Sequence, residues 1–158
     1  MVECLSLSGL PASRLEIEIT EAAVLQHGAT THEVLEQLRA LGVAVALDDF
    51  GTGFSSLSSL LRFPFDKLKI DRSFVADIGT SPNAAAITRA IVGLGDNLNL
   101  TTTGEGVETF EQLAELRRLG CLEAQGYLFS PARPNSEVPR LLREIGTAKP
   151  AALTPAFG

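Results

Sequence analysis

The sequence predicts an α/β fold in which parallel strands alternate with helices around a sheet or barrel. Short apolar, β-favouring runs recur along the chain, and amphipathic helical stretches separate them. Each run ends in acidic, basic or carboxamide residues, as expected where a strand gives way to a loop. With 158 residues, 45% hydrophobic and 20% charged, the chain is long enough to bury the core of one globular domain.

Short β-favouring segments mark the expected strands. They lie at Leu15–Glu21, Val43–Leu47, Lys67–Asp71, Leu98–Thr103 and Glu123–Phe129. The fourth segment is weak as an apolar run, because it ends in three threonines before the Gly104-Glu105 pair. Alternation of these segments with helices favours parallel pairing.

Helices with recognisable ends fill the intervals, at 30–41, 56–62, 81–98 and 109–119. Thr30 with Glu33, and Thr109 with Gln112, have the spacing of a capping box. Ser81 followed by proline is typical of an N-cap and the first helical position. A glycine follows the first and the last of these helices and supplies a stop signal.

Composition narrows the partners and the compartment. The formal net charge of -6 argues against duplex nucleic acid, because phosphate contacts rely on clusters of Lys and Arg. No run approaches the roughly 18 apolar residues that span a bilayer, and no signal-peptide pattern begins the chain. Cys4 and Cys121 are isolated and are expected to be reduced thiols. We therefore expect a cytoplasmic protein without a membrane segment.

Carboxylates gather at the predicted strand ends. In parallel α/β folds the carboxyl ends of the strands meet on one side, where ligands bind. Converging carboxylates repel one another unless protons or cations neutralise them. Since neither His nor Cys joins them, the oxygen ligands favour magnesium or manganese over zinc. The residues are Glu18, Glu21, Asp48, Asp49, Asp71, Glu105 and Glu108, accompanied by Lys69 and Gln125.

The segment Asp48-Asp49-Phe50-Gly51-Thr52-Gly53 is the sharpest single feature. Adjacent strand residues face opposite sides, so both aspartates can face inward only where the strand ends and the backbone turns. Gly51 and Gly53 allow such a turn. The alternative is an acidic, glycine-rich turn that caps a helix beginning near Ser55.

Lys69 and Glu105 each admit two interpretations. Lys69 lies in a segment that otherwise has the pattern of a buried strand, so its ammonium needs partners. A bridging phosphate or a metal-bound water is one candidate, and a structural pair with Asp71 or Glu18 is the other. Glu105 lies between two glycines, which indicates either close approach of the backbone to a ligand or a turn with a solvated acid.

Five motifs resemble, in order and spacing, the successive motifs of the EAL domain family. They are Glu18-Ile-Thr-Glu21, Asp48-Asp-Phe-Gly-Thr-Gly53, Lys69-Ile-Asp-Arg-Ser73, Glu105-Gly-Val-Glu108 and Gln125-Gly-Tyr-Leu-Phe129. The resemblance covers residues 8–134. It implies a (β/α)8-type barrel that hydrolyses cyclic di-GMP to linear pGpG with two Mg²⁺ or Mn²⁺ ions.

The resemblance also implies a role for each strand-end residue. The metal ligands would be Glu18, Asp48, Asp49 and Glu105, with Asp48 shared between the two ions. The catalytic residues would be Lys69, Glu105, Asp49 and Gln125. Supporting residues would be Glu21, Asp71, Glu108, Gly51 and Gly53.

The chain lacks counterparts of the family's Glu-Ala-Leu strand and of the following strand with its Asn ligand, both of which would precede Met1. We therefore expect a partial TIM-like barrel, about five of eight βα units, in residues 1–146, and a flexible tail at 147–158. A partial barrel exposes a sheet edge at residues 15–19, which favours a homodimer or other self-association.

Three interpretations remain open at this point. The chain is part of an active phosphodiesterase, a complete but non-catalytic module that binds cyclic di-GMP or a protein, or a scaffold for unrelated magnesium chemistry as in enolase-like barrels. We favour the first, because none of the metal or lysine positions that are present has been lost. Acting alone, the chain is expected to be weakly active or inactive.

Overall fold

The structure is a computed structural model that describes residues 2–26, 28–52 and 57–147. Within these residues, five parallel strands form one sheet in chain order. The strands are β1 (Glu16–Thr20), β2 (Ala44–Phe50), β3 (Lys67–Ile70), β4 (Thr101–Gly104) and β5 (Glu123–Ala124). The helices are α1 (Val2–Ser8), α2 (Glu21–Gln26), α3 (Gly28–Ala40), α4 (Leu57–Arg62), α5 (Arg72–Ala76), α6 (Pro82–Leu98), α7 (Phe110–Arg118) and α8 (Val138–Thr147).

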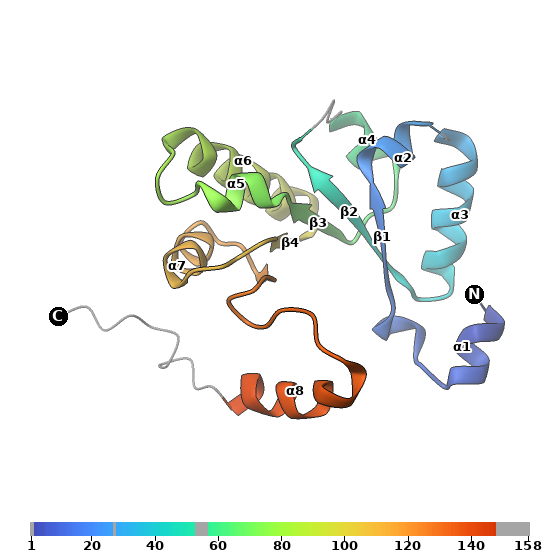
Figure 1. The fold of residues 1–158 in the computed structure, drawn as a ribbon. Helices are drawn as coiled ribbons and strands as arrows, with labels where there is room; N and C mark the ends of the chain where they lie inside the picture. The colour runs from blue at the N-terminus through green and yellow to red at the C-terminus, as the bar shows by residue number, and fades with distance from the viewer. Residues whose placement is uncertain (1, 27, 53–56, 148–158) are drawn as a thin grey trace.

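Helices cover the outer face of the sheet, where the apolar core lies (Figure 1). Alternate strand residues such as Leu47, Leu68 and Ile70 face this core and are at most 1% exposed. The other set of alternate residues, which faces away from the helices, is polar in β1 and β3. This arrangement confirms the predicted α/β class with parallel strands and outer helices.

The strand bounds differ from prediction in informative places. The second strand continues to Phe50, past the aspartates where it was expected to end. The fourth begins at Thr101 rather than Leu98, because α6 continues through Leu98 and Asn99 closes it in a left-handed conformation. The fifth strand has two residues, far fewer than the expected segment to Phe129.

Two of the three predicted helix caps are confirmed, and the helix start predicted at Ser56 lies outside the described residues. Ser81 caps α6 by accepting a hydrogen bond from the Ala84 amide, and Thr109 with Gln112 forms a complete capping box on α7. The box predicted at Thr30 is wrong, because α3 already begins at Gly28 and places Thr30 inside the helix.

The short helices α1, α2 and α5 and the C-terminal helix α8 were not predicted. Helix α8 carries its apolar residues on one face, at Val138, Leu141, Leu142 and Ile145, and includes Thr147. The rest of the predicted tail, 148–158, lies outside the described residues. Among the described helices, none is long and apolar enough to cross a membrane.

Candidate functional site

Lys69, near the carboxyl end of the central strand β3, lies at the centre of a group of carboxylates. Its side chain is 4% exposed, and its Nζ lies 2.8 Å from Glu18 Oε1, 3.0 Å from Asp48 Oδ1 and 2.5 Å from Glu105 Oε1. We call these four residues the Lys69 cluster. The three carboxylates come from β1, from β2 and from the turn after β4, so the cluster joins the strand ends as the sequence predicts.

Charge and burial act against each other in the Lys69 cluster. Burial alone would lower the pKa of Lys69, but hydrogen bonds to Glu105, Glu18 and Asp48 outweigh it and raise the pKa. Burial raises the pKa of Glu105; the Lys69 ammonium opposes this rise, and the nearby Asp48 and Glu18 add to it. The site therefore holds more negative charge than one ammonium neutralises.

Both aspartates reach the site because the end of β2 is irregular. The register with β3 shifts between Leu47 and Phe50, and Asp49 has a positive φ of 55°. The Asp49 amide donates to Asp48 Oδ1 at 3.0 Å. One carboxylate oxygen each from Asp48, Asp49 and Glu105 lie within 4.8 Å of one another. The irregularity thus lies at Asp49 inside β2, and not in a turn at the end of the strand as predicted.

These residues fit a divalent cation with a preference for oxygen. The group of Asp48, Asp49 and Glu105 offers carboxylate oxygens and contains neither His nor Cys. Hard cations such as Mg²⁺ and Mn²⁺ prefer such ligands. Glu18 lies outside this group but contacts the same ammonium as Asp48 and Glu105.

Gln125 joins the cluster from the chain that follows β5. Its Nε2 donates to Glu105 Oε1 at 2.8 Å. The glycines beside Glu105 approach protein atoms rather than open space: a Cβ at Gly104 would lie 2.5 Å from Leu116, and a Cβ at Gly106 would lie 2.7 Å from Arg72. Close packing against these residues therefore accounts for both glycines.

The predicted supporting residues have separate positions. The Asp71 carboxylate accepts hydrogen bonds from the Ser73 amide at 2.9 Å and from its hydroxyl, so it caps α5, and these bonds outweigh burial and lower its pKa. Glu21 is buried at the start of α2. Gly51 has a φ of 98°, and a Cβ there would lie 3.0 Å from the Phe74 ring. Gly53 is outside the described residues.

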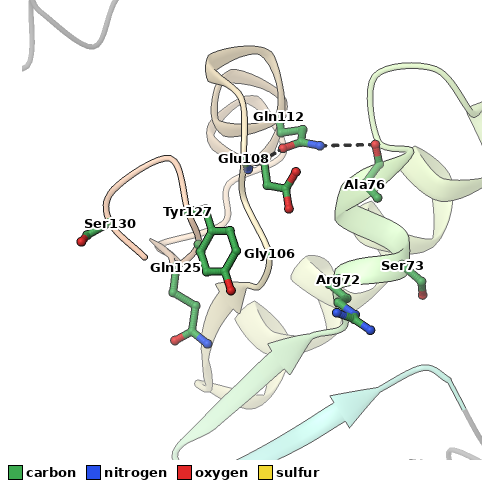
Figure 2. A pocket seen from close by; sticks show the side chains of 10 residues that line it. Arg72, Ser73, Ala76, Gly106, Glu108, Gln112, Gln125, Tyr127 and Ser130 are labelled. Atoms are coloured by element: carbon green, nitrogen blue, oxygen red, sulfur yellow. Dashed lines mark hydrogen bonds between the residues drawn. The ribbon is translucent and has the colours of Figure 1, made fainter. Parts of the chain in front are cut away.

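A cavity of about 540 Å³ adjoins the cluster at Gln125. Figure 2 shows Tyr127 and Gln125 on one side of it and Arg72 and Ser73, from the start of α5, on the other. Glu108 also lines this cavity, and Gln112 closes its far end by donating to the Ala76 carbonyl at 3.4 Å. The cavity was not predicted from the sequence, because its walls come from three segments that only the fold brings together.

A second ionic group lies on the same face of the sheet and was also missed. Lys67 Nζ lies 2.7 Å from Glu16 Oε2 and 2.7 Å from Glu123 Oε2, and the Thr103 hydroxyl donates to Glu123 Oε2 at 2.9 Å. We call these four residues the Lys67 cluster. The signal was present in the sequence, because residues two apart on a strand share a face. The pairs Glu16/Glu18, Lys67/Lys69 and Glu123/Gln125 have that spacing.

Comparisons with known proteins agree with this geometry. The family model of the EAL domain matches residues 2–132. The cyclic di-GMP phosphodiesterase NbdA of Pseudomonas aeruginosa is 47% identical over 139 residues, which are 88% of this chain but 18% of that protein. The chain therefore spans less than a fifth of that relative's length.

Solved structures show the same relationship. The EAL domain of Mycobacterium smegmatis DcpA is 44% identical with a TM-score of 0.84, over 90% of this chain and 64% of that one. The manganese and cyclic di-GMP complex of Klebsiella pneumoniae BlrP1 is 40% identical with a TM-score of 0.77, over 82% of this chain and 33% of that one. The chain belongs to the EAL domain family.

Proposed function

We propose that this chain binds cyclic di-GMP through divalent metal ions and carries most of the residues that hydrolyse it to pGpG. The observation that carries the proposal is the convergence of Asp48, Asp49 and Glu105, with Lys69 beside them. The relatives support the substrate, since BlrP1 was solved with manganese and cyclic di-GMP together.

Glu18, Asp48, Asp49 and Glu105 would hold the ions, with Mg²⁺ or Mn²⁺ as the physiological metal. Such ions, when bound, lower the pKa of a coordinated water and neutralise charge on a phosphate. The three carboxylates carry more negative charge than the Lys69 ammonium neutralises. They would therefore repel the phosphates of cyclic di-GMP until metal ions bind. This makes binding of the phosphodiester dependent on metal.

Lys69 would orient the attacking water or a phosphate oxygen. Its ammonium is buried and raised in pKa, so it stays protonated and acts as a donor and a fixed positive charge, not as a base. Gln125 donates to the same Glu105 oxygen that contacts Lys69 and would help to keep that carboxylate aimed at the phosphate.

The cavity beside Gln125 would take one guanine base. Arg72 offers a planar pair of donors that suits the O6 and N7 acceptors of guanine, and the exposed ring of Tyr127 offers a stacking surface. Because Gln125 both lines the cavity and binds Glu105, a base there lies next to the carboxylates.

We infer that the chain alone turns over slowly or not at all. The family resemblance implies two further ligands, from the Glu-Ala-Leu strand and from an Asn, that this sequence does not contain. With fewer ligands, metal affinity falls, and with it the fraction of chain ready for hydrolysis.

Two experiments test these statements. In calorimetry, cyclic di-GMP should bind the purified chain with Ca²⁺ present and should not bind with a chelator; the absence of binding in both conditions would refute the proposed function. In an assay of pGpG formation with Mn²⁺, we expect turnover far below that of an intact EAL domain. Turnover equal to the intact domain would refute the dependence on further ligands.

We also propose self-association and a cytoplasmic location. Within the described sheet, β1 is an edge strand, and an apolar groove lined by Ile17, Ile19, Val34, Leu35 and Leu38 lies beside it. Light scattering should therefore give a mass above that of one chain, whereas a monomer at high concentration would contradict self-association. The free thiols Cys4 and Cys121 suit a reducing compartment.

A further inference from the structure

The Lys67 cluster has no part in the proposed chemistry. Like the Lys69 cluster, it consists of a lysine of β3 that contacts carboxylates from other parts of the sheet. Lys67 is 17% exposed in its side chain and makes two contacts of 2.7 Å, to Glu16 and to Glu123. Buried or half-buried charges of this kind cost desolvation energy, so an arrangement of apolar residues would stabilise the sheet at least as well. The cluster therefore calls for an explanation beyond stability.

The partners of Lys67 come from opposite edges of the described sheet. Glu16 lies in β1 and Glu123 lies in β5, while Lys67 lies in the central strand β3. In a flat sheet the two edge strands would be about 19 Å apart, four spacings between neighbours. One ammonium can reach carboxylates from both edges only because the sheet curves toward its polar face. The Lys67 cluster thus ties the curvature of the sheet to specific charges.

Strand β5 has the shortest ladder of the described sheet. Strands β1 and β2 pair over five residues, whereas β4 and β5 pair over two, Thr103 with Glu123 and Gly104 with Ala124. The Glu123 carboxylate adds bonds to Lys67 in β3 and to Thr103 in β4. The chain just after β5 also makes backbone hydrogen bonds, from the Gln125 amide to the Gly104 carbonyl at 2.9 Å and from the Val107 amide to the Gln125 carbonyl at 3.0 Å. The Glu123 side chain adds to this backbone pairing and joins β5 to the central strand β3.

Two residues that contact the Lys69 cluster follow Glu16 and Glu123 closely in the chain, one in β1 and one just after β5. Glu18 lies two residues after Glu16, and Gln125 lies two residues after Glu123, on the same face. The distance between Glu16 and Glu123 therefore influences the distance between Glu18 and Gln125, which lie two residues further along the chain.

We propose that Lys67 is a positioning residue: by binding Glu16 and Glu123 together, it sets the sheet curvature at which Glu18 and Gln125 converge on Lys69 and Glu105. The importance of this for cyclic di-GMP rests on the proposed function. The geometric part does not, because the Lys69 cluster forms from the protein's own side chains.

A variant that removes all three charges separates positioning from stability. Lys67→Met alone leaves two carboxylates facing each other and lowers stability whatever the role of the cluster. The triple variant Lys67→Met, Glu16→Gln, Glu123→Gln removes the repulsion and the desolvation cost together, so its Tm should remain near that of the parent. Arg118→Gln, which breaks the Arg118–Glu115 pair on α7, is a matched control for loss of a cation outside the sheet.

The readout is the nuclear magnetic resonance spectrum of the metal-free chain, in the ¹⁵N signals of the Lys69 ammonium and the Gln125 carboxamide. We expect both signals to shift or broaden in the triple variant at an unchanged Tm, and neither to change in Arg118→Gln. Calcium-dependent binding of cyclic di-GMP by the triple variant should weaken by about tenfold, the lower end of the loss in metal affinity when groups that support the ligands are removed.

Unchanged Lys69 and Gln125 signals in a folded triple variant would overturn the proposal. So would changes that accompany a fall in Tm and vanish when the folded state is restabilised by lower temperature or added osmolyte, since these indicate a purely structural role. The spectra need neither metal nor nucleotide. A chain that fails to bind cyclic di-GMP but shows the spectral change therefore refutes the proposed function and supports the positioning role.

Discussion

The two lysines of β3 lie two residues apart on one face of the sheet, yet their surroundings differ. Lys69 contacts three carboxylates and is 4% exposed, whereas Lys67 contacts two and is 17% exposed. Around Lys69, a third acid and the bulge at Asp49 bring oxygens within 4.8 Å of one another. Near Lys67, the Thr103 hydroxyl stabilises the Glu123 carboxylate by donating a hydrogen bond to it.

This difference indicates that the Lys69 cluster can bind a ligand, whereas the Lys67 cluster supports the sheet. In the Lys67 cluster, Glu16 and Glu123 share the Lys67 ammonium, and Glu123 also accepts a hydrogen bond from the Thr103 hydroxyl. In the Lys69 cluster the acids outnumber the available cations, and Asp49 adds to the excess. A larger excess is more unfavourable unless a divalent cation binds, so the Lys69 cluster, with Asp49 beside it, is better suited to a metal than the Lys67 cluster.

The largest effect should come from Asp48→Asn, which removes a carboxylate that contacts Lys69 and also belongs to the group of Asp48, Asp49 and Glu105. Metal-dependent binding of cyclic di-GMP should weaken by on the order of a hundredfold or more, because a bound ion contributes several kcal/mol. Calorimetry with Ca²⁺ measures this. Asp96→Asn, the same change at an exposed position on α6, is the control and should bind like the parent.

Unaltered binding by Asp48→Asn would show that Asp48 is not a metal ligand. It would also contradict the proposal that the Lys69 cluster, unlike the Lys67 cluster, binds metal.

Replacing each lysine by methionine compares the clusters in stability. Lys69→Met should lower the free energy of unfolding by about 2–4 kcal/mol, because three carboxylates are left around a buried side chain. Lys67→Met should cost about 1 kcal/mol, since its partners are more exposed to water. Urea denaturation measures both, and Mn²⁺ should recover stability in Lys69→Met only. Equal losses, or recovery in both variants, would contradict the distinction.

The sequence predicted the Lys69 cluster better than the Lys67 cluster. Glu18, Asp48, Lys69 and Glu105 were found because each lies at or near the end of a β-favouring run, and strand ends meet in parallel sheets. Lys67 and Glu16 begin their strands, and their pairing depends on a curvature that no local pattern encodes. The bulge at Asp49 escaped for a similar reason: a positive φ at a non-glycine residue is set by its neighbours in space.

The helices show the same limit. Polar caps at Ser81 and Thr109 gave reliable starts, since a cap acts within a few residues of sequence. Thr30 misled because capping spacing also occurs inside helices. Helix α5 was missed because it has five residues and depends on Asp71 for its cap, a residue assigned in advance to the site.

The pH dependence of stability should separate parent from triple variant at both extremes. The hydrogen bond from Lys67 lowers the pKa of Glu123 below its ordinary 4.5, so its contribution is complete above 4.5 and is lost as pH falls through the folded value. Burial would lower the pKa of Lys67, but Glu123 and Glu16 raise it above 10.5. That contribution is complete below 10.5 and is lost as pH rises through the folded value.

Urea denaturation from acid to alkaline pH should therefore show the stability difference between parent and triple variant changing below 4.5 and above 10.5 and flat between them. A difference that varies instead near neutral pH would indicate that other groups control the cluster.

The smallest effect should come from Gln125→Ala. Loss of one hydrogen bond to Glu105 should weaken binding of cyclic di-GMP by about three- to tenfold. The free energy of unfolding should change by no more than about 0.5 kcal/mol, because Gln125 is exposed. Calorimetry and urea denaturation on the same sample check both, and a large loss of stability would assign Gln125 to the support rather than the site.

The most direct test of the contrast is a titration of the chain with Mg²⁺, followed by the side-chain carboxyl ¹³C signals. Metal binding at the Lys69 cluster predicts shifts for Asp48, Asp49, Glu105 and Glu18, with Glu16 and Glu123 unmoved. Shifts confined to Glu16 and Glu123, or no shift in any of the six, would contradict a metal site at the strand ends.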